Sequence, residues 1–253
     1  MSKKLRKVNT KKSKKKIVII VLIILLILGV SGFFGYKYLF GDNKKKVNVK
    51  VLDSIDKYGY SLSDRDSAYY KEEFEKLKKI LNEKEIDNKE YATEVARLFV
   101  IDLYTMSTKV NKYDVGGREF FNNNRVDMYD LKVMDTIYNT MSDDTYGDRK
   151  QELPEVSKVN TESVEESSYK FIEDVIVDVN TGKRSCRDGY EVSQNDSNKC
   201  VKDVEKVYVV NLTMEYKKDL DYDTEASVVV AKEETSDRWS VVEYKPELDA
   251  FSD

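Results

Sequence analysis

The sequence predicts an α+β protein with one N-terminal transmembrane helix, followed by about three helices packed on a curved antiparallel sheet of about four strands. Three observations support this class. Residues 17–36 carry no charged side chain. Apolar residues then recur at intervals of three and four up to about residue 141, which is the period of an amphipathic helix. After Pro154 apolar and polar residues alternate, which is the period of a strand.

The first sixteen residues form a basic cytoplasmic tail with nine lysines and arginines and no acid. Because nine of the 43 basic residues lie there, the other 237 residues carry 34 basic and 47 acidic side chains, a net charge of −13. An acidic body is a poor partner for nucleic acid, so we expect no nucleic-acid binding. The tail is expected to contact anionic lipid headgroups, at about 1 kcal/mol for each basic residue.

Residues 17–40 are predicted to cross the membrane. The charge-free run from Ile17 to Tyr36 has twenty residues, and as a helix it would span about 30 Å, the thickness of the hydrocarbon core. Aromatic residues at 36, 38 and 40 would lie at the far interface. The lysine asymmetry places the N-terminus in the cytoplasm and everything from about residue 41 outside. A cleaved signal peptide remains an alternative, with small residues only at 31, 32 and 35 for cleavage.

Residues 41–60 are polar and rich in lysine and predict a stalk, after which residues 61–253 form the extracytoplasmic domain. Its first helix has apolar residues spaced four, three and four apart from Tyr70 to Leu81, with Ser63 or Asp66 as its N-cap. The second covers residues 88–108 and has little polar surface, so it should be the most buried. The third is expected over residues 125–141, with these residues on its apolar face: Leu131, Met134, Ile137, Tyr138 and Met141.

Four segments in the second half of the domain have strand character. Residues 207–217 alternate strictly, with Tyr208 and Tyr216 on the same side. Residues 225–233 and 238–244 repeat the pattern with turn residues between them, and residues 171–179 read as an earlier strand. Helices followed by strands predict helices packed on one face of an antiparallel meander.

Cys186 and Cys200 are the only cysteines of the chain, and both lie in one polar, turn-rich segment. Outside the membrane the surroundings are oxidising, so we expect a disulfide that pins loop 186–200. Closing a loop of this length contributes about 3 kcal/mol in the chain-entropy description. Two free thiols remain the alternative.

The composition argues against most enzyme classes. The chain has no histidine, which excludes histidine bases, histidine-activated nucleophiles and histidine metal ligands. A proton-transfer catalyst would need a carboxylate or lysine whose pKa burial shifts by two to three units. Asp219, Asp221 and Asp223 look like the start of a calcium loop, but Thr224 stands where glycine is needed, so we expect no metal site and no cofactor.

One carboxylate interrupts the apolar face of the second helix. Asp102 lies between Ile101 and Leu103, where it could face a pocket, pair with a lysine or point to water. Aromatic residues could line such a pocket beside it, or could simply be core. The candidates are Tyr104, Tyr208, Tyr216 and Trp239.

The order of elements resembles the nuclear-transport-factor-2-like fold over about residues 61–250. The markers are the long second helix, the break at Asp114–Gly117, the run Tyr216–Asp223 and the terminal Trp-x-Val-Val at residues 239–242. The resemblance implies a cone of helices on a curved sheet. The His-Asp or acid pair of the family's enzymes does not carry over, because the chain has no histidine.

The layout is similar to that of single-pass assembly proteins of conjugation and type IV secretion in Gram-positive bacteria. It implies a membrane-anchored, non-catalytic interaction or assembly domain of the cell envelope, with another envelope protein as its partner. The alternative is a cone that binds a small ligand, or a degenerate enzyme, at the cell surface.

Overall fold

The structure is a computed structural model that describes residues 46–245. The predicted basic tail (1–16), the predicted transmembrane helix (17–40), residues 41–45 and residues 246–253 lie outside the described residues. Within residues 46–245, no helix combines the length and the hydropathy needed to span a bilayer.

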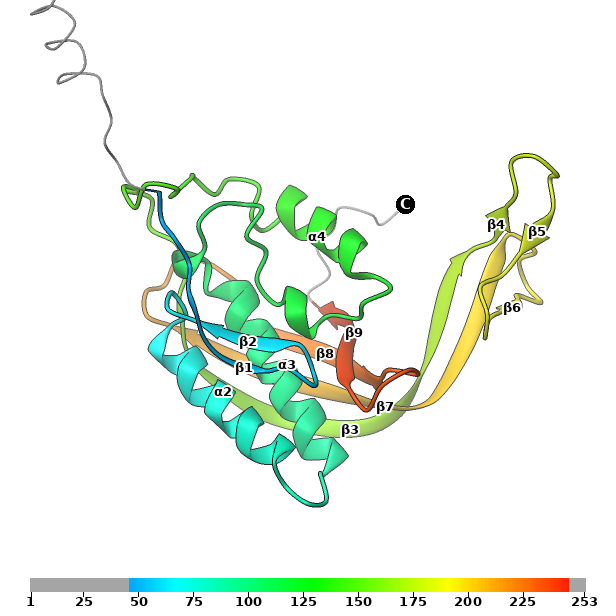
Figure 1. Cartoon of the computed structure of the whole chain (residues 1–253), viewed down its shortest axis with the longest axis horizontal. Helices are drawn as coiled ribbons and strands as arrows, with labels where there is room; N and C mark the ends of the chain where they lie inside the picture. Colours follow the sequence, from blue (N-terminus) through cyan, green and yellow to red (C-terminus); the bar gives the residue numbers. More distant parts are fainter. Residues whose placement is uncertain (1–45, 246–253) are drawn as a thin grey trace, which may run out of the picture. The chain divides into compact units, whose positions relative to one another are not determined.

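The described residues form the predicted α+β architecture (Figure 1). Three α-helices precede a large antiparallel sheet: α2 (Ala68–Leu81), α3 (Asn88–Tyr104) and α4 (Val126–Asp135). The sheet has the order β3-β7-β8-β9, formed by β3 (Val156–Asp174), β7 (Lys199–Tyr216), β8 (Glu225–Lys232) and β9 (Trp239–Lys245).

Helix α3 is the centre of the core, as its sequence predicts. Eleven of its seventeen residues are buried, and it contacts all four strands of the main sheet. Asp87 caps its N-terminus, where its carboxylate accepts hydrogen bonds from the Lys89 and Glu90 N–H groups at 2.8 and 3.2 Å. Helix α2 lies beside α3 and buries the apolar face that includes Phe74 and Leu77.

Two details of the predicted helices are wrong. Ser67 caps α2, since its hydroxyl accepts a hydrogen bond from the Tyr70 N–H at 3.0 Å, whereas Asp66 accepts one from the Ser63 N–H and so stabilises the preceding turn. Helix α4 ends at Asp135, six residues before the predicted end at Met141. Its buried side chains are Tyr129 and Val133, while Leu131 is exposed.

The predicted stalk is wrong for residues 51–60, which belong to the folded domain. Strands β1 (Val51–Ile55) and β2 (Tyr60–Ser63) form an antiparallel hairpin. Tyr58 and Tyr60 at its turn are buried, and the Tyr60 hydroxyl lies 2.8 Å from that of Tyr91 in α3. A tyrosine that is both packed and hydrogen-bonded ties the hairpin to the core.

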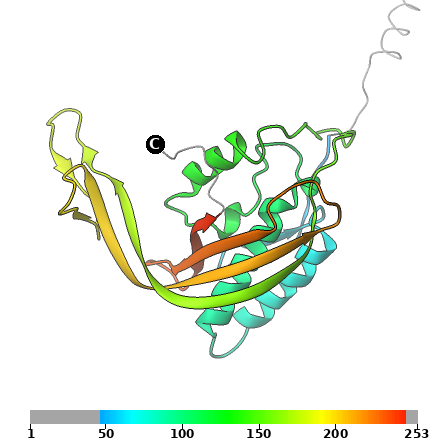
Figure 2. The same cartoon turned by 180° about the vertical axis from the view of Figure 1, so that it is seen from behind.

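Strands β3 and β7 are much longer than the other two. The pairing between β7 and β8 covers only Val207–Thr213 of β7. Both long strands, which pair with each other, therefore continue beyond the sheet. We call the projecting part, residues 167–206, the arm (Figures 1 and 2). Its tip carries three strands of two residues each: β4 (Ile176–Val177), which pairs with β5 (Arg184–Ser185), and β6 (Glu191–Val192), which pairs with β7.

Candidate functional sites

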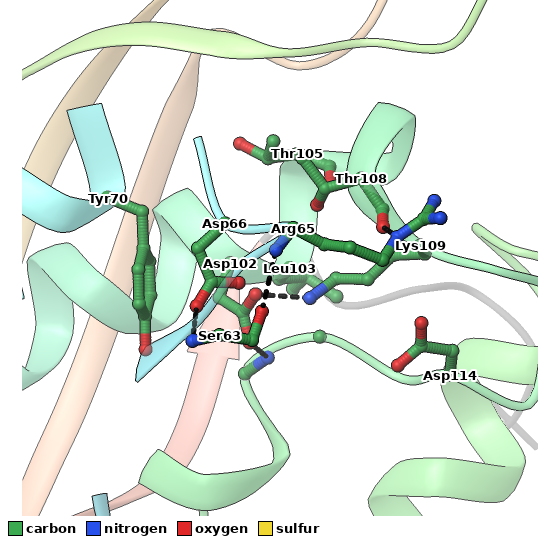
Figure 3. Close-up of polar contacts among 12 residues, drawn as sticks. Ser63, Arg65, Asp66, Tyr70, Asp102, Leu103, Thr105, Thr108, Lys109 and Asp114 are labelled. Carbon is green, nitrogen blue, oxygen red and sulfur yellow. Dashed lines mark hydrogen bonds and ion pairs between the residues drawn. The ribbon is translucent and has the colours of Figure 1, made fainter. Parts of the chain in front are cut away.

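Asp102 lies in the last turn of α3 and pairs with a lysine. The Lys109 amine donates a hydrogen bond to one carboxylate oxygen (Figure 3). The Gly117 N–H donates to the other at 2.6 Å. Lys109 is buried. Burial alone would lower the pKa of Lys109, but the charge of Asp102 outweighs it, so the pKa lies above its ordinary range and the amine stays charged.

The two glycines of the predicted break allow the loop to reach Asp102. A Cβ atom on Gly116 would lie 2.1 Å from the Asp102 carbonyl oxygen, so only glycine fits. Gly117 has φ +74°, which also favours glycine. The Tyr129 hydroxyl donates to the Gly116 carbonyl at 2.5 Å and fixes the loop. The Gly-Gly pair therefore positions the N–H that binds Asp102.

A cavity of about 310 Å³ lies beside this ion pair. Its charged lining residues are Arg65, Asp66, Asp102, Lys109, Asp114, Arg118 and Glu119. Several are already satisfied within the protein: Arg65 donates to the Thr108 carbonyl at 2.6 Å, and Arg118 donates to Asp130 at 2.7 Å. The cavity is polar and of mixed charge, and its size is at the lower end of small-ligand sites.

Glu119 is the residue of this cavity with the shifted carboxyl pKa that a proton-transfer catalyst would need. Burial, helped by the charge of Asp102, raises the pKa of Glu119 to about 7. Hydrogen bonds from the Tyr70 hydroxyl at 2.8 Å and from Ser61 partly oppose this rise. Glu119 was not among the predicted site residues. The sequence feature that pointed to its burial is its position between the Gly-Gly break and two phenylalanines.

The four aromatic candidates do not gather around Asp102. None of them lines the cavity. Tyr208 contacts Trp239, with ring centroids 5.0 Å apart, and the Trp239 indole donates to Asn88 at 3.1 Å. Tyr216 contacts Tyr222, while Tyr104 is buried in the core. The structure therefore does not bring these four side chains together around Asp102, and it places them in the core and at its rim.

The cysteine pair is present as predicted. Cys186 and Cys200 are bonded, with their Cα atoms 5.7 Å apart. Cys200 is buried in β7, where it pairs with Glu173 of β3 on one side and Val192 of β6 on the other. The bond thus fastens the loop to the strands of the arm. Among residues 46–245, no group of three acidic or cysteine side chains could hold a metal ion.

The tip of the arm exposes aliphatic side chains. Val179 is 93% exposed, and four others are more than half exposed: Ile172, Ile176, Val177 and Val192. Single exposed aliphatic residues are ordinary, but here five of them lie within residues 172–192 of one projecting element.

The base of the arm is held by a small core of its own. Val207, Ala231 and Val242 are buried there, and Tyr169 and Phe171 of the arm pack against them. Arg125, just before α4, donates to the Tyr169 hydroxyl at 3.3 Å and to the Val242 carbonyl at 3.1 Å. Lys202 of the arm also pairs with Glu234 of the turn between β8 and β9. The arm therefore leaves the sheet in a defined direction.

No protein-family model, curated protein or solved structure matches the chain.

Proposed function

We propose that the protein is a membrane-anchored, non-catalytic interaction or assembly domain outside the membrane, and that the tip of the arm contacts an envelope protein. The observation that supports this most is the group of exposed aliphatic residues on an arm whose base is fixed by packing. An element that is already ordered loses little conformational entropy on binding. The disulfide suits oxidising surroundings outside the cytoplasm.

The membrane anchor, the nuclear-transport-factor-2-like relationship and a place in a secretion or conjugation complex belong to the same proposal. The charge-free run over residues 17–36 supports the anchor. Helices followed by a long antiparallel sheet support the relationship at the level of element order.

The test is site-specific photocrosslinking in native cells with a photoreactive residue at position 179. We expect a crosslinked partner, and we expect Ile176→Ser to reduce its yield several-fold, because the contact is apolar. Leu131→Ser on α4 is the matched control, since Leu131 is equally exposed but lies outside the arm. A crosslink that survives Ile176→Ser and disappears with Leu131→Ser would place the contact elsewhere.

A second candidate function is the binding of a small polar ligand in the cavity beside Asp102. It is favoured by one observation: Glu119, whose pKa of about 7 is suited to proton exchange, lines the same cavity as the Asp102–Lys109 pair. Asp102→Asn separates the two functions. If the protein is an interaction domain, cells with the Asp102→Asn variant should grow and assemble the complex normally. If the variant folds but function is lost, the result favours the ligand site.

A further inference from the structure

Strand β3 forms one edge of the main sheet, and most of that edge is open. It pairs with β7 on one side, and from Thr161 to Asp174 no strand within residues 46–245 pairs with its other side. Figure 2 shows β3 along the rim of the sheet and into the arm. Such an edge presents unpaired N–H and C=O groups, which can pair with another extended chain.

The register identifies the β3 residues whose backbone faces outward. The Met214 N–H donates to the Thr224 carbonyl, on the side of β7 that faces β8. Because residues alternate along a strand, Leu212, Val210 and Tyr208 also turn their backbone groups toward β8. Their partners in β3 are Thr161, Val164 and Glu166, so these three direct their N–H and C=O groups toward the open edge.

The body covers this edge only at its beginning. The Val159 N–H donates to the Tyr69 hydroxyl at 2.9 Å, and the Val159 carbonyl accepts from Arg97 at 2.8 Å. Helices α2 and α3 supply these two side chains, and no equivalent cover is present beyond Thr161 in the described chain. Register shifts at Thr161/Ser163 and Ser167/Tyr169 leave a regular segment, residues 163–167, between them.

The charges of this segment indicate the chemistry of the partner. Residues 161–168 contain three glutamates and no lysine or arginine. Glu166 pairs with Lys206 of β7, whereas Glu162 and Glu165 have no cation within ion-pair distance among residues 46–245. A second copy pairing antiparallel here would set glutamates against glutamates, which is unfavourable. Lysine or arginine on the incoming strand would instead be attracted.

We propose that the open edge of β3 binds an extended, cationic segment of the partner protein by adding a strand to the sheet. This inference rests on the interaction function proposed above and specifies how the partner is held. Main-chain hydrogen bonds would provide the affinity, and the glutamates would select a basic sequence.

The test compares two substitutions at one position in native cells, with photoreactive residues placed separately at 165 on the edge and at 179 on the tip. Glu166→Pro removes an outward N–H, and Glu166→Ser keeps that N–H while removing the charge. We expect Glu166→Pro to reduce the crosslink from 165 about tenfold, because the strand loses a hydrogen bond and meets the proline ring. Glu166→Ser should reduce it by about threefold or less.

A direct measurement accompanies it, with the full chain in detergent and the acetylated peptide Lys-Val-Lys-Thr-Lys-Val-Lys as probe. We expect the peptide to slow hydrogen exchange at the amides of Val164 and Glu166, and we expect the same peptide with glutamate in place of lysine to have no effect. A melting measurement on each variant shows whether Glu166→Pro still folds. If it does not, the hydrogen-exchange measurement on the wild-type protein alone decides the test.

The outcomes separate the two proposals. A crosslink from 179 that is unaffected by Glu166→Pro, with none from 165 and no amide protection, overturns edge pairing but leaves the interaction function standing. No crosslink from either position overturns both. A dimer of the full chain that is lost in Glu166→Pro identifies a second copy as the occupant and also overturns the proposal.

Discussion

Replacing Glu94 by glutamine should stabilise the domain at neutral pH. Glu94 lies in α3, where it is buried near Glu73 of α2 and lies 3.5 Å from the Arg97 Nε atom. Glu73 accepts hydrogen bonds from Arg97 at 2.7 and 3.1 Å and from Lys76 at 2.7 Å, so it stays ionised and its pKa is lowered despite burial. Burial, and then the neighbouring charge of Glu73, raises the pKa of Glu94 from 4.5 to about 8.

The size of the effect follows from the two protonation equilibria. The unfolded chain loses the Glu94 proton near pH 4.5, whereas the folded protein keeps it until about pH 8. The stability that the neutral carboxyl provides is therefore complete below pH 4.5, declines as the pH rises and is lost above pH 8. At pH 7 this decline amounts to at most about 3 kcal/mol. Glutamine has the same shape and helix propensity without this cost.

The assay is urea unfolding of a fragment of residues 45–253 between pH 4.5 and 8. We expect the variant and the wild type to be equally stable at the acidic end, and the variant to gain about 1–3 kcal/mol at pH 7. Glu75→Gln, an exposed control on α2, should change nothing. Glu73→Gln should instead destabilise, because it leaves Arg97 without its main partner. A Glu94→Gln variant that is no more stable at pH 7 than at pH 4.5, relative to wild type, would refute the protonated state of Glu94.

Three further predictions concern the loop, the disulfide and the topology. Gly116→Ala should destabilise the fragment by about 3 kcal/mol or more in urea unfolding, because the new Cβ would meet the Asp102 carbonyl. The control Gly182→Ala, in open space at φ +66°, should cost about 1 kcal/mol. Equal losses of stability in the two variants would contradict the close approach at Gly116. Non-reducing mass spectrometry should find Cys186 linked to Cys200, and alkylation of both thiols without reduction would disprove the bond. Protease added to intact spheroplasts should digest the chain after residue 41, and full protection would reverse the proposed topology.

The helical half of the fold was largely predictable, because the spacing of apolar residues along a helix follows the face that is buried. Helix α3 shows this best: its apolar residues cover nearly the whole circumference, and the structure buries it under both α2 and the sheet. Tyr58 and Tyr60 could not be placed in the same way. They follow a lysine-rich segment, and their burial depends on partners more than thirty residues away.

The long strands were predicted only in part, because an open two-stranded ribbon has no buried face to impose alternation. Strand β3 has three register shifts, and each one moves its side chains to the other face. In β7, buried and partly buried residues alternate from Tyr208 to Met214, within the stretch 207–217 that the sequence predicted. For the cavity, the sequence indicated only that Asp102 could face a pocket, pair with a lysine or point to water. Glu119 lines the cavity from a short 3₁₀ turn that has no periodic signal.

The separate small core at the base of the arm has an evolutionary consequence. The tip beyond it, including the disulfide-bonded loop, shares no buried side chain with the main core. Insertions, deletions and substitutions at the tip therefore carry little cost for the folding of the body. Selection on such a protein would act on two nearly independent parts, and we expect related chains to keep the body and the arm's base while the tip diverges rapidly to follow its partner.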